Sequence, residues 1–156
     1  MKAKTIFFAV IMLLGFAATA QKSTAYFIKG FLPMAHQLQE EWGIPVSIIL
    51  GVSVLESGSG TSLNARQLNN FFGMTGKNHI KTRRSVYKQY ATAKDSFEDF
   101  CGMISRKKFY KSLKNNLDYH AWLNAMNKAN YAGAKGVWIT RVTSVIKKQG
   151  LAKYDK

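Results

Sequence analysis

The pattern of hydrophobic and polar positions along the chain predicts a mainly helical protein. One apolar stretch is residues 44–60, where Ile49, Val52 and Glu56 recur at i, i+3 and i+7 and so share one helical face. Pro45 suits the first turn of this helix, because its missing N–H costs nothing there. Two glycines close behind favour a helix end. We therefore predict that Glu56 lies in the last turn of the helix, on an apolar face.

The predicted surroundings of Glu56 favour acid catalysis. Apolar neighbours and the negative end of the helix dipole both raise the pKa of a carboxyl group. A carboxylic acid that stays protonated near neutral pH can act as a general acid. Glu56 is also the only acidic residue between Glu41 and Asp95. The alternative interpretation is an exposed glutamate at a helix end that only aids solubility.

Further helices are expected along most of the chain. We predict helices over residues 25–42 with an interruption at Pro33, 63–68 capped by Thr61 or Ser62, 96–108, 113–126 and 137–149. Ser96 and Asp99 have the spacing of a capping box, so we expect Asp95, Glu98 and Asp99 to serve a helix N-terminus rather than catalysis.

Two segments break the helical periodicity. Residues 69–74 combine amides and aromatic rings, which suit the floor of a sugar-binding cleft. The alternative is a capping turn with two core phenylalanines, which we prefer for either phenylalanine alone. Residues 75–90 are polar and basic with extended-structure formers, and predict a small two-stranded hairpin or an irregular arm.

The first twenty residues have the pattern of a secretory signal peptide. Lys2 and Lys4 precede an apolar run over residues 6–16, and Ala18-Thr19-Ala20 supplies the small residues of a cleavage site. The run is short for a membrane span, and an uncleaved anchor is the alternative. We therefore expect one domain over residues 21–156 that is periplasmic or secreted, monomeric by default, and without a stable membrane anchor after cleavage.

The predicted mature chain is strongly basic. Two of the 23 basic residues and none of the 8 acidic ones lie in residues 1–20, so residues 21–156 carry 21 basic and 8 acidic residues, a net charge of +13. In an exported protein this charge favours anionic polymers of the cell envelope as partners. No nucleic-acid-binding motif accompanies it, so nucleic acid is not an expected partner.

Neither a disulfide nor a metal or cofactor site is expected. Cys101 is the only cysteine, and its spacing from Phe97 and Ile104 favours a buried structural thiol. The three histidines are far apart in sequence and have no ligand spacing.

Six motifs, taken in order, resemble bacterial β-N-acetylglucosaminidases of glycoside hydrolase family 73, which include flagellar muramidase-like domains and many autolysins. The resemblance covers nearly all of residues 21–156. The motifs are Leu32-Pro33-x-Ala35, Gly43-Ile44-Pro45, Leu55-Glu56-Ser57-Gly58-x-Gly60-x-Ser62, Asn69-Asn70-x-Phe72-Gly73, Tyr90 with Ser96-Phe97-x-Asp99, and Asn130-Tyr131-Ala132.

The resemblance implies an α+β, predominantly α-helical, lysozyme-like single domain with a small β-hairpin lobe. It also implies a peptidoglycan hydrolase that cleaves glycan strands after N-acetylglucosamine. By position, Glu56 is the general acid, and Tyr131 lies near it to position the acid or the 2-acetamido group. Asn70, Phe72, Gly73 and Tyr90 are then predicted to bind substrate.

Two departures from the family pattern leave the mechanism open. No Asp or Glu lies between Ser57 and Lys94, where a second carboxylate is expected, and the tyrosine motif continues as Ala132-Gly133-Ala134 instead of Ala-Thr-Asp. We prefer substrate assistance, in which the N-acetyl oxygen attacks the anomeric carbon. The alternatives are a transglycosylase that uses Glu56 alone, a second acid such as Asp95 or Asp99, and a non-catalytic domain that binds the cell wall.

Overall fold

The computed structural model describes residues 23–133 and 135–156, so the signal peptide predicted over residues 1–20 lies outside the described part. A helix runs over residues 23–42 and is followed by α2 (Val46–Ser57), α3 (Leu63–Leu68), α4 (Ala93–Ser105), α5 (Tyr110–Leu113), α6 (Tyr119–Lys128), α7 (Lys135–Gln149) and the 3₁₀ helix η1 (Leu151–Tyr154). None of the described helices is long and apolar enough to cross a membrane.

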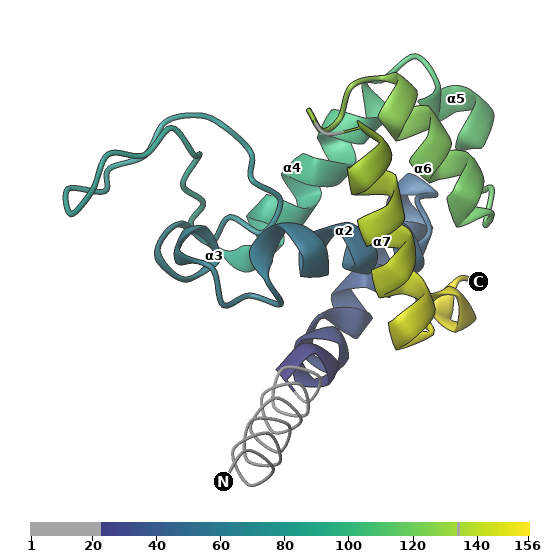
Figure 1. Cartoon of the computed structure of the whole chain (residues 1–156), viewed down its shortest axis with the longest axis horizontal. Coiled ribbons are helices and arrows are strands. Elements are labelled where there is room, and N and C mark those ends of the chain that lie inside the picture. Colours follow the sequence, from purple (N-terminus) through teal and green to yellow (C-terminus); the bar gives the residue numbers. More distant parts are fainter. Residues whose placement is uncertain (1–22, 134) are drawn as a thin grey trace, which may run out of the picture.

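Helix α2 is the centre of the molecule (Figure 1). Every residue from Val46 to Val54 is buried, and the helix packs against α6, α7 and η1. Gly51 allows α7 to approach closely, because a Cβ atom at this position would lie 2.8 Å from Cγ1 of Ile146. The helix is therefore buried on all sides over this length, rather than having only one apolar face.

Side chains from distant parts of the chain hold the start of α2. The Val46 N–H donates to Oε1 of Gln39 at 2.9 Å. The Ser47 N–H and hydroxyl donate to the two carboxylate oxygens of Asp155, at 2.7 and 2.6 Å. A carboxylate is favoured at a helix N-terminus, where free N–H groups and the helix dipole attract it. Asp155 thus caps α2 from the C-terminal segment.

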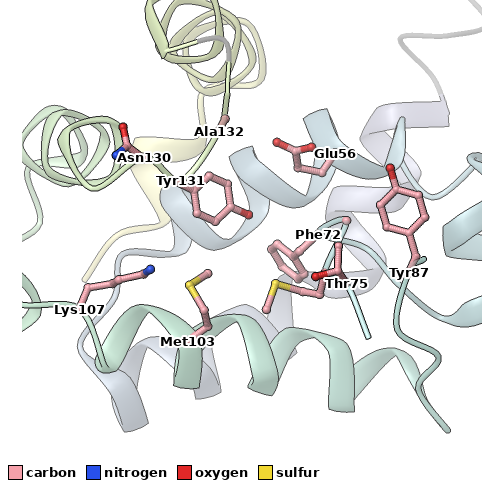
Figure 2. Close-up of a pocket in the computed structure, with 11 residues that line it drawn as sticks. Glu56, Phe72, Thr75, Tyr87, Met103, Lys107, Asn130, Tyr131 and Ala132 are labelled. Atoms are coloured by element: carbon pink, nitrogen blue, oxygen red, sulfur yellow. The ribbon is translucent and has the colours of Figure 1, made fainter. Parts of the chain in front are cut away.

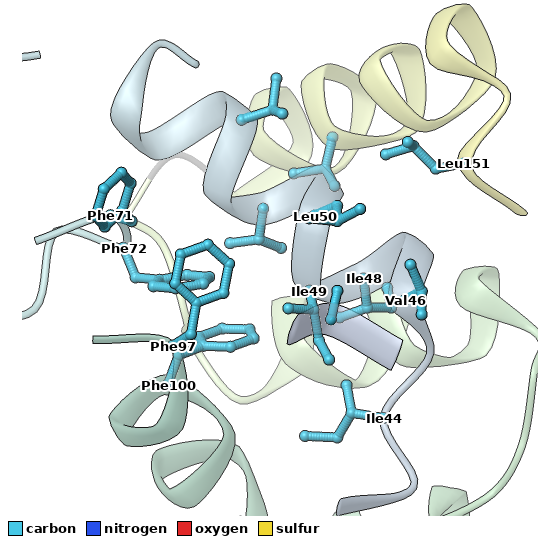
Figure 3. Close-up of a cluster of buried hydrophobic side chains, with 14 of the residues drawn as sticks. Ile44, Val46, Ile48, Ile49, Leu50, Phe71, Phe72, Phe97, Phe100 and Leu151 are labelled. Carbon is cyan, nitrogen blue, oxygen red and sulfur yellow. The ribbon is translucent and has the colours of Figure 1, made fainter. Parts of the chain in front are cut away.

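An aromatic cluster joins α4 to the segment after α3 (Figure 3) and extends to Phe31 of the helix over residues 23–42. Phe97 stacks on Phe31 with ring centroids 5.0 Å apart, and Phe72 stacks on Phe100 with centroids 4.2 Å apart. Cys101 is fully buried beside this cluster, and burial raises the pKa of its thiol. The prediction of a buried structural thiol is confirmed.

Some helix boundaries agree with the sequence and others differ. The single helix predicted over residues 113–126 is wrong, because the chain has α5 and α6 with a break over residues 114–118. Ser62 caps α3 as predicted, since its hydroxyl accepts from the Ala65 N–H at 3.1 Å. The interruption at Pro33 was wrong, because the helix is continuous over residues 23–42. Ile28, Ala35 and Leu38 on either side of Pro33 are buried, and this packing outweighs the backbone hydrogen bond that proline cannot make.

The capping box of α4 lies four residues earlier than predicted. The Thr92 hydroxyl accepts from the Asp95 N–H, and the Asp95 carboxylate accepts from the Thr92 N–H. Ser96 instead accepts from the Phe71 N–H at 3.1 Å. Asp95 therefore serves a helix N-terminus as predicted, whereas Asp99 lies inside α4 and makes other contacts.

Residues 74–89, which we call the arm, extend away from the helices (Figure 1). The arm runs out and back but contains one isolated antiparallel bridge, between Thr75 and Tyr87, and no named strand among its described residues. Polar side chains replace a ladder here, for example Asn78, whose amide donates to the carbonyls of Ser85 and Tyr87. Of the two predicted forms, the hairpin and the irregular arm, the structure has the irregular arm.

Candidate active site

Glu56 lies in the last turn of α2, as predicted. Gly58 ends the helix in the left-handed conformation, with φ of 56°, which glycine adopts without strain. Ser57 stabilises the same turn, because its hydroxyl donates to the Ser53 carbonyl at 2.6 Å and accepts from the Gly60 N–H at 2.8 Å. The Glu-Ser-Gly sequence therefore fixes where the Glu56 side chain leaves the helix.

The Glu56 carboxylate faces a pocket of about 380 Å³ between the helices and the base of the arm (Figure 2). The pocket is lined by parts of the chain that are far apart in sequence: α2, the segment after α3, the arm, the region of α4 and the loop before α7. The lining residues are Glu56, Phe72, Gly73, Met74, Thr75, Tyr87, Met103, Lys107, Asn130, Tyr131 and Ala132. Among these, Glu56 is the only carboxylate, so the pocket offers one carboxyl group.

Trp138 of α7 holds the carboxylate from the side of the helices. Its indole N–H donates to Oε1 of Glu56 at 2.9 Å, and the tryptophan is 5% exposed. The indole nitrogen can only donate, so Oε1 must accept. The carbonyl oxygen of a protonated carboxyl group is the stronger acceptor, so this hydrogen bond favours the proton on Oε2.

Burial and this hydrogen bond act on Glu56 in opposite directions. Burial raises the pKa of the carboxyl group above its ordinary value, because the charged form loses water, and the Trp138 hydrogen bond lowers it. The effect of burial is the larger one. The pKa of Glu56 is thus raised, as predicted. The burial that raises it comes from the whole fold and not only from the apolar neighbours on the same helix.

Tyr131, in the loop before α7, directs its ring into the pocket near Glu56 (Figure 2). Its ring lies 5.0 Å from that of Trp138 and 6.1 Å from that of Phe100, centroid to centroid. The hydroxyl oxygen is buried and has no hydrogen-bond partner among the described residues. Burial and the nearby Glu56 raise the pKa of this phenol well above its ordinary value, so the hydroxyl is neutral. An unpaired buried hydroxyl is uncommon in a folded protein, and this one belongs to a residue that lines the pocket.

The other predicted site residues fall into two sets. Phe72 and Gly73 line the pocket, and Phe72 does so with a ring that is mostly buried in the aromatic cluster. Asn70 and Tyr90 are absent from the pocket lining. Asn70 is 1% exposed, and its amide donates to the carbonyls of Met74 and Lys88 while its oxygen accepts from the Met74 N–H. Asn70 thus joins the two ends of the arm.

Tyr90 belongs to a second polar group behind the pocket. Its hydroxyl donates to Oδ2 of Asp99 at 2.7 Å, and the Lys88 ammonium reaches the same oxygen at 2.7 Å. Burial alone would raise the pKa of Asp99, but the hydrogen bonds from Lys88 and Tyr90 hold it below its usual value. With Asp95 engaged in the capping box, neither aspartate proposed as a second acid lines the pocket.

The sequence analysis did not identify Trp138 as a site residue. It lies 82 residues from Glu56, and its position in the pattern of α7 is that of an ordinary helix residue. The described residues contain no group of three His, Cys, Asp or Glu that could hold a metal ion.

Comparison with known proteins identifies the chain's relatives. A family profile described as glucosaminidase, mannosyl-glycoprotein endo-beta-N-acetylglucosaminidase, matches residues 32–151. An N-acetylmuramoyl-L-alanine amidase domain-containing protein of Staphylococcus aureus is 24% identical over 162 residues, which are 90% of this chain and 26% of that protein. The chain thus spans about a quarter of the length of this relative.

Solved structures share the fold. The catalytic domain of the autolysin Auto from Listeria monocytogenes superposes with a TM-score of 0.69 at 20% identity, over 85% of this chain and 88% of that one. A peptidoglycan hydrolase from Sphingomonas sp. A1 superposes with a TM-score of 0.66 at 19% identity, over 83% and 92% of the two chains.

Proposed function

The chain belongs to the glucosaminidase family, glycoside hydrolase family 73, and from this premise we propose that it hydrolyses peptidoglycan glycan strands after N-acetylglucosamine with Glu56 as the general acid. The observation that carries the proposal is the Glu56 carboxyl group, whose burial raises its pKa at the wall of an open pocket. The relatives named as a peptidoglycan hydrolase and an autolysin support the substrate class. The basic composition suits an anionic envelope.

We propose that the reaction is substrate-assisted. Oε2 of Glu56 donates its proton to the glycosidic oxygen while the carbonyl oxygen of the 2-acetamido group attacks the anomeric carbon, and the bond to the leaving sugar breaks. The carboxylate then takes a proton from water, which opens the cyclic intermediate. The presence of one carboxylate in the pocket lining favours this route over a two-carboxylate mechanism.

The other predicted residues have supporting roles in this proposal. The Tyr131 hydroxyl, buried and without a protein partner, hydrogen-bonds the 2-acetamido group and orients its oxygen. Phe72 and Gly73 form the floor for the N-acetylglucosamine ring. Asn70 and Tyr90 act one layer behind, by holding the base of the arm against the pocket.

Digestion of purified sacculi followed by mass spectrometry tests the proposal. We expect the wild type to release products with reducing-end N-acetylglucosamine, and Glu56→Gln to lower the rate by about 10²- to 10⁴-fold. Glu98→Gln is the matched control, because the Glu98 carboxylate pairs with Lys94 along α4 and does not line the pocket. It should digest sacculi at the wild-type rate.

Three outcomes would overturn parts of the proposal. Anhydro-muramic products would indicate a lytic transglycosylase that uses the same glutamate. Equal digestion by wild type and Glu56→Gln would remove Glu56 from the mechanism. Binding without any digestion by the wild type would indicate a wall-binding domain, and that binding should weaken steeply as salt screens the basic charge.

A further inference from the structure

Glu56 stands between two cavities. Besides the pocket described above, a smaller cavity of about 210 Å³ is lined by Leu55, Glu56, Ala132, Val137, Trp138 and Arg141. Glu56 and Ala132 line both cavities, so the same carboxyl group is reached from either side. A glycosidic oxygen joins two sugars, and an acid that protonates it needs room for a sugar on each side. The smaller cavity provides room on the second side.

The walls of this smaller cavity combine apolar surface with one cation. Leu55 and Val137 supply aliphatic groups, and Val137 is 60% exposed although it is large and apolar. The indole of Trp138 forms a further wall, while its N–H is already used by Glu56. Aliphatic and aromatic surfaces suit the C–H faces of a sugar ring, and polar groups among them give specificity.

Arg141 is the polar group that remains available. It is exposed on α7 and has no hydrogen bond or ion pair to any described residue. Two cations of the arm have partners, since Arg83 donates to Gln67 and Asn64 and Lys88 pairs with Asp99, whereas Lys107 lines the larger pocket. A free guanidinium offers five donors in a planar arrangement that matches a carboxylate in a bidentate manner.

We infer that the smaller cavity binds the sugar that leaves, and that Arg141 binds a carboxylate carried by that sugar. The inference rests on the proposed function: if cleavage follows N-acetylglucosamine, the leaving sugar is N-acetylmuramic acid. Its lactyl group is a carboxylate when free and carries a peptide with carboxylates when substituted. The larger pocket, with Phe72 and Tyr131, then holds N-acetylglucosamine, whose substituents are uncharged.

The test varies the charge of the substrate and of the protein together. The substrates are soluble glycan strands with their peptides removed, the same strands with their carboxyl groups converted to amides, and strands that retain their peptides. We expect Arg141→Ala to lower kcat/KM by about tenfold on strands with free carboxylates, which is the size of effect that loss of a hydrogen bond to a charged group produces. The kcat/KM on amidated strands should stay unchanged. Arg141→Lys should keep part of the effect.

Two control variants locate the effect. Lys148→Ala removes a charge from an exposed position on the same helix and lies outside both cavities, so it should not distinguish the substrates. Lys107→Ala removes the cation of the larger pocket, and it too should not distinguish them. If Arg141→Ala loses kcat/KM mainly on peptide-free strands, the lactyl carboxylate is the ligand of Arg141. If it loses kcat/KM only on peptide-bearing strands, the ligand is a carboxylate of the peptide.

Equal losses on charged and amidated strands would overturn the inference, as would a carboxylate-dependent loss with Lys107→Ala instead of Arg141→Ala. A separate measurement keeps the inference distinct from the proposed function. In a Glu56→Gln background, Arg141→Ala should weaken the binding of charged strands by about tenfold, whether or not the wild type cleaves them. Unchanged binding there would overturn the subsite, and absence of cleavage by the wild type would overturn only the proposed function.

Discussion

Glu56 and Thr75 face the same pocket, but different interactions hold the two side chains in place. Glu56 ends a helix whose residues from Val46 to Val54 are buried, and Trp138 of a second packed helix fixes its carboxylate. Thr75 belongs to the arm, where one bridge and a few asparagine amides replace a strand ladder. Apolar packing therefore builds one wall, and local hydrogen bonds build the other.

The difference between these walls separates two requirements of the site. In the proposed reaction the proton donor must stay in one place, because misplacement of a reacting group is costly, and dense packing provides that rigidity. The opposite wall must admit a long polymer. A segment held by few exposed hydrogen bonds opens locally at a lower free energy than the core does. We therefore expect the arm to move before α2 does.

The largest effect on stability is expected in the aromatic cluster. Phe97 is fully buried and contacts the rings of Phe31, Phe71 and Phe72. Phe97→Ala should lower the free energy of unfolding by about 3–5 kcal/mol, measured by urea denaturation, since it leaves a cavity in a packed core. Phe97→Leu, which keeps most of the volume, should cost less. A loss below about 1 kcal/mol for the alanine variant would contradict a densely packed wall.

Asn70→Ala is expected to lower the free energy of unfolding by less than Phe97→Ala does, and to loosen the arm in particular. This change removes three hydrogen bonds to the backbone of Met74 and Lys88, but water can reach the freed groups when the arm moves, so we expect about 1–3 kcal/mol. Hydrogen exchange of the arm amides should accelerate while that of α2 does not. Asn124→Ala, an exposed asparagine on α6, is the control. Equal acceleration in α2 would show that the two walls are not independent.

The smallest expected change is a displacement of the pH profile by Trp138→Phe. The aromatic ring keeps its packing against Tyr131, and only the N–H donor to Glu56 is lost. That donor lowers the pKa of Glu56, so its removal raises the pKa further. A general acid works while protonated, and activity falls as the pH rises through its pKa. The alkaline limb of kcat/KM should therefore move to higher pH.

A second tryptophan provides the control for this measurement. Trp122 is buried and donates its N–H to the Asn116 carbonyl, away from the pocket. Trp122→Phe removes the same kind of donor and should leave the alkaline limb in place. An alkaline limb that is unchanged in Trp138→Phe, or displaced equally in both variants, would contradict control of Glu56 by Trp138.

Features set by neighbouring residues were predictable from the sequence. The end of α2 at Gly58, the Ser62 cap and the burial of Cys101 each depend on a few adjacent residues with known preferences. The capping box was placed on Ser96 and Asp99 because this pair has the same spacing as Thr92 and Asp95. The tertiary hydrogen bond from the Phe71 N–H to the Ser96 hydroxyl distinguishes the two pairs. Local patterns could not supply that information.

Contacts between distant residues were not predictable. Trp138 contacts Glu56 across 82 residues, and Asp155 caps Ser47 across 108. Asn70 was correctly singled out as special, but its environment depends on where the two ends of the arm meet. The family resemblance located Glu56 and Tyr131 in the chain, and the fold shows which atoms surround them.

The bridge between Thr75 and Tyr87 also determines where this protein can tolerate insertions. The Lys88 N–H donates to the Met74 carbonyl at 2.8 Å, so a hydrogen bond joins the two ends of the arm at its base. This hydrogen bond does not involve the residues at the tip of the arm. The entropy cost of closing a loop grows only slowly with its length. Loops grafted between Asn78 and Ser85 should therefore leave α2 undisturbed, which makes the arm the natural place to engineer recognition of a different polymer.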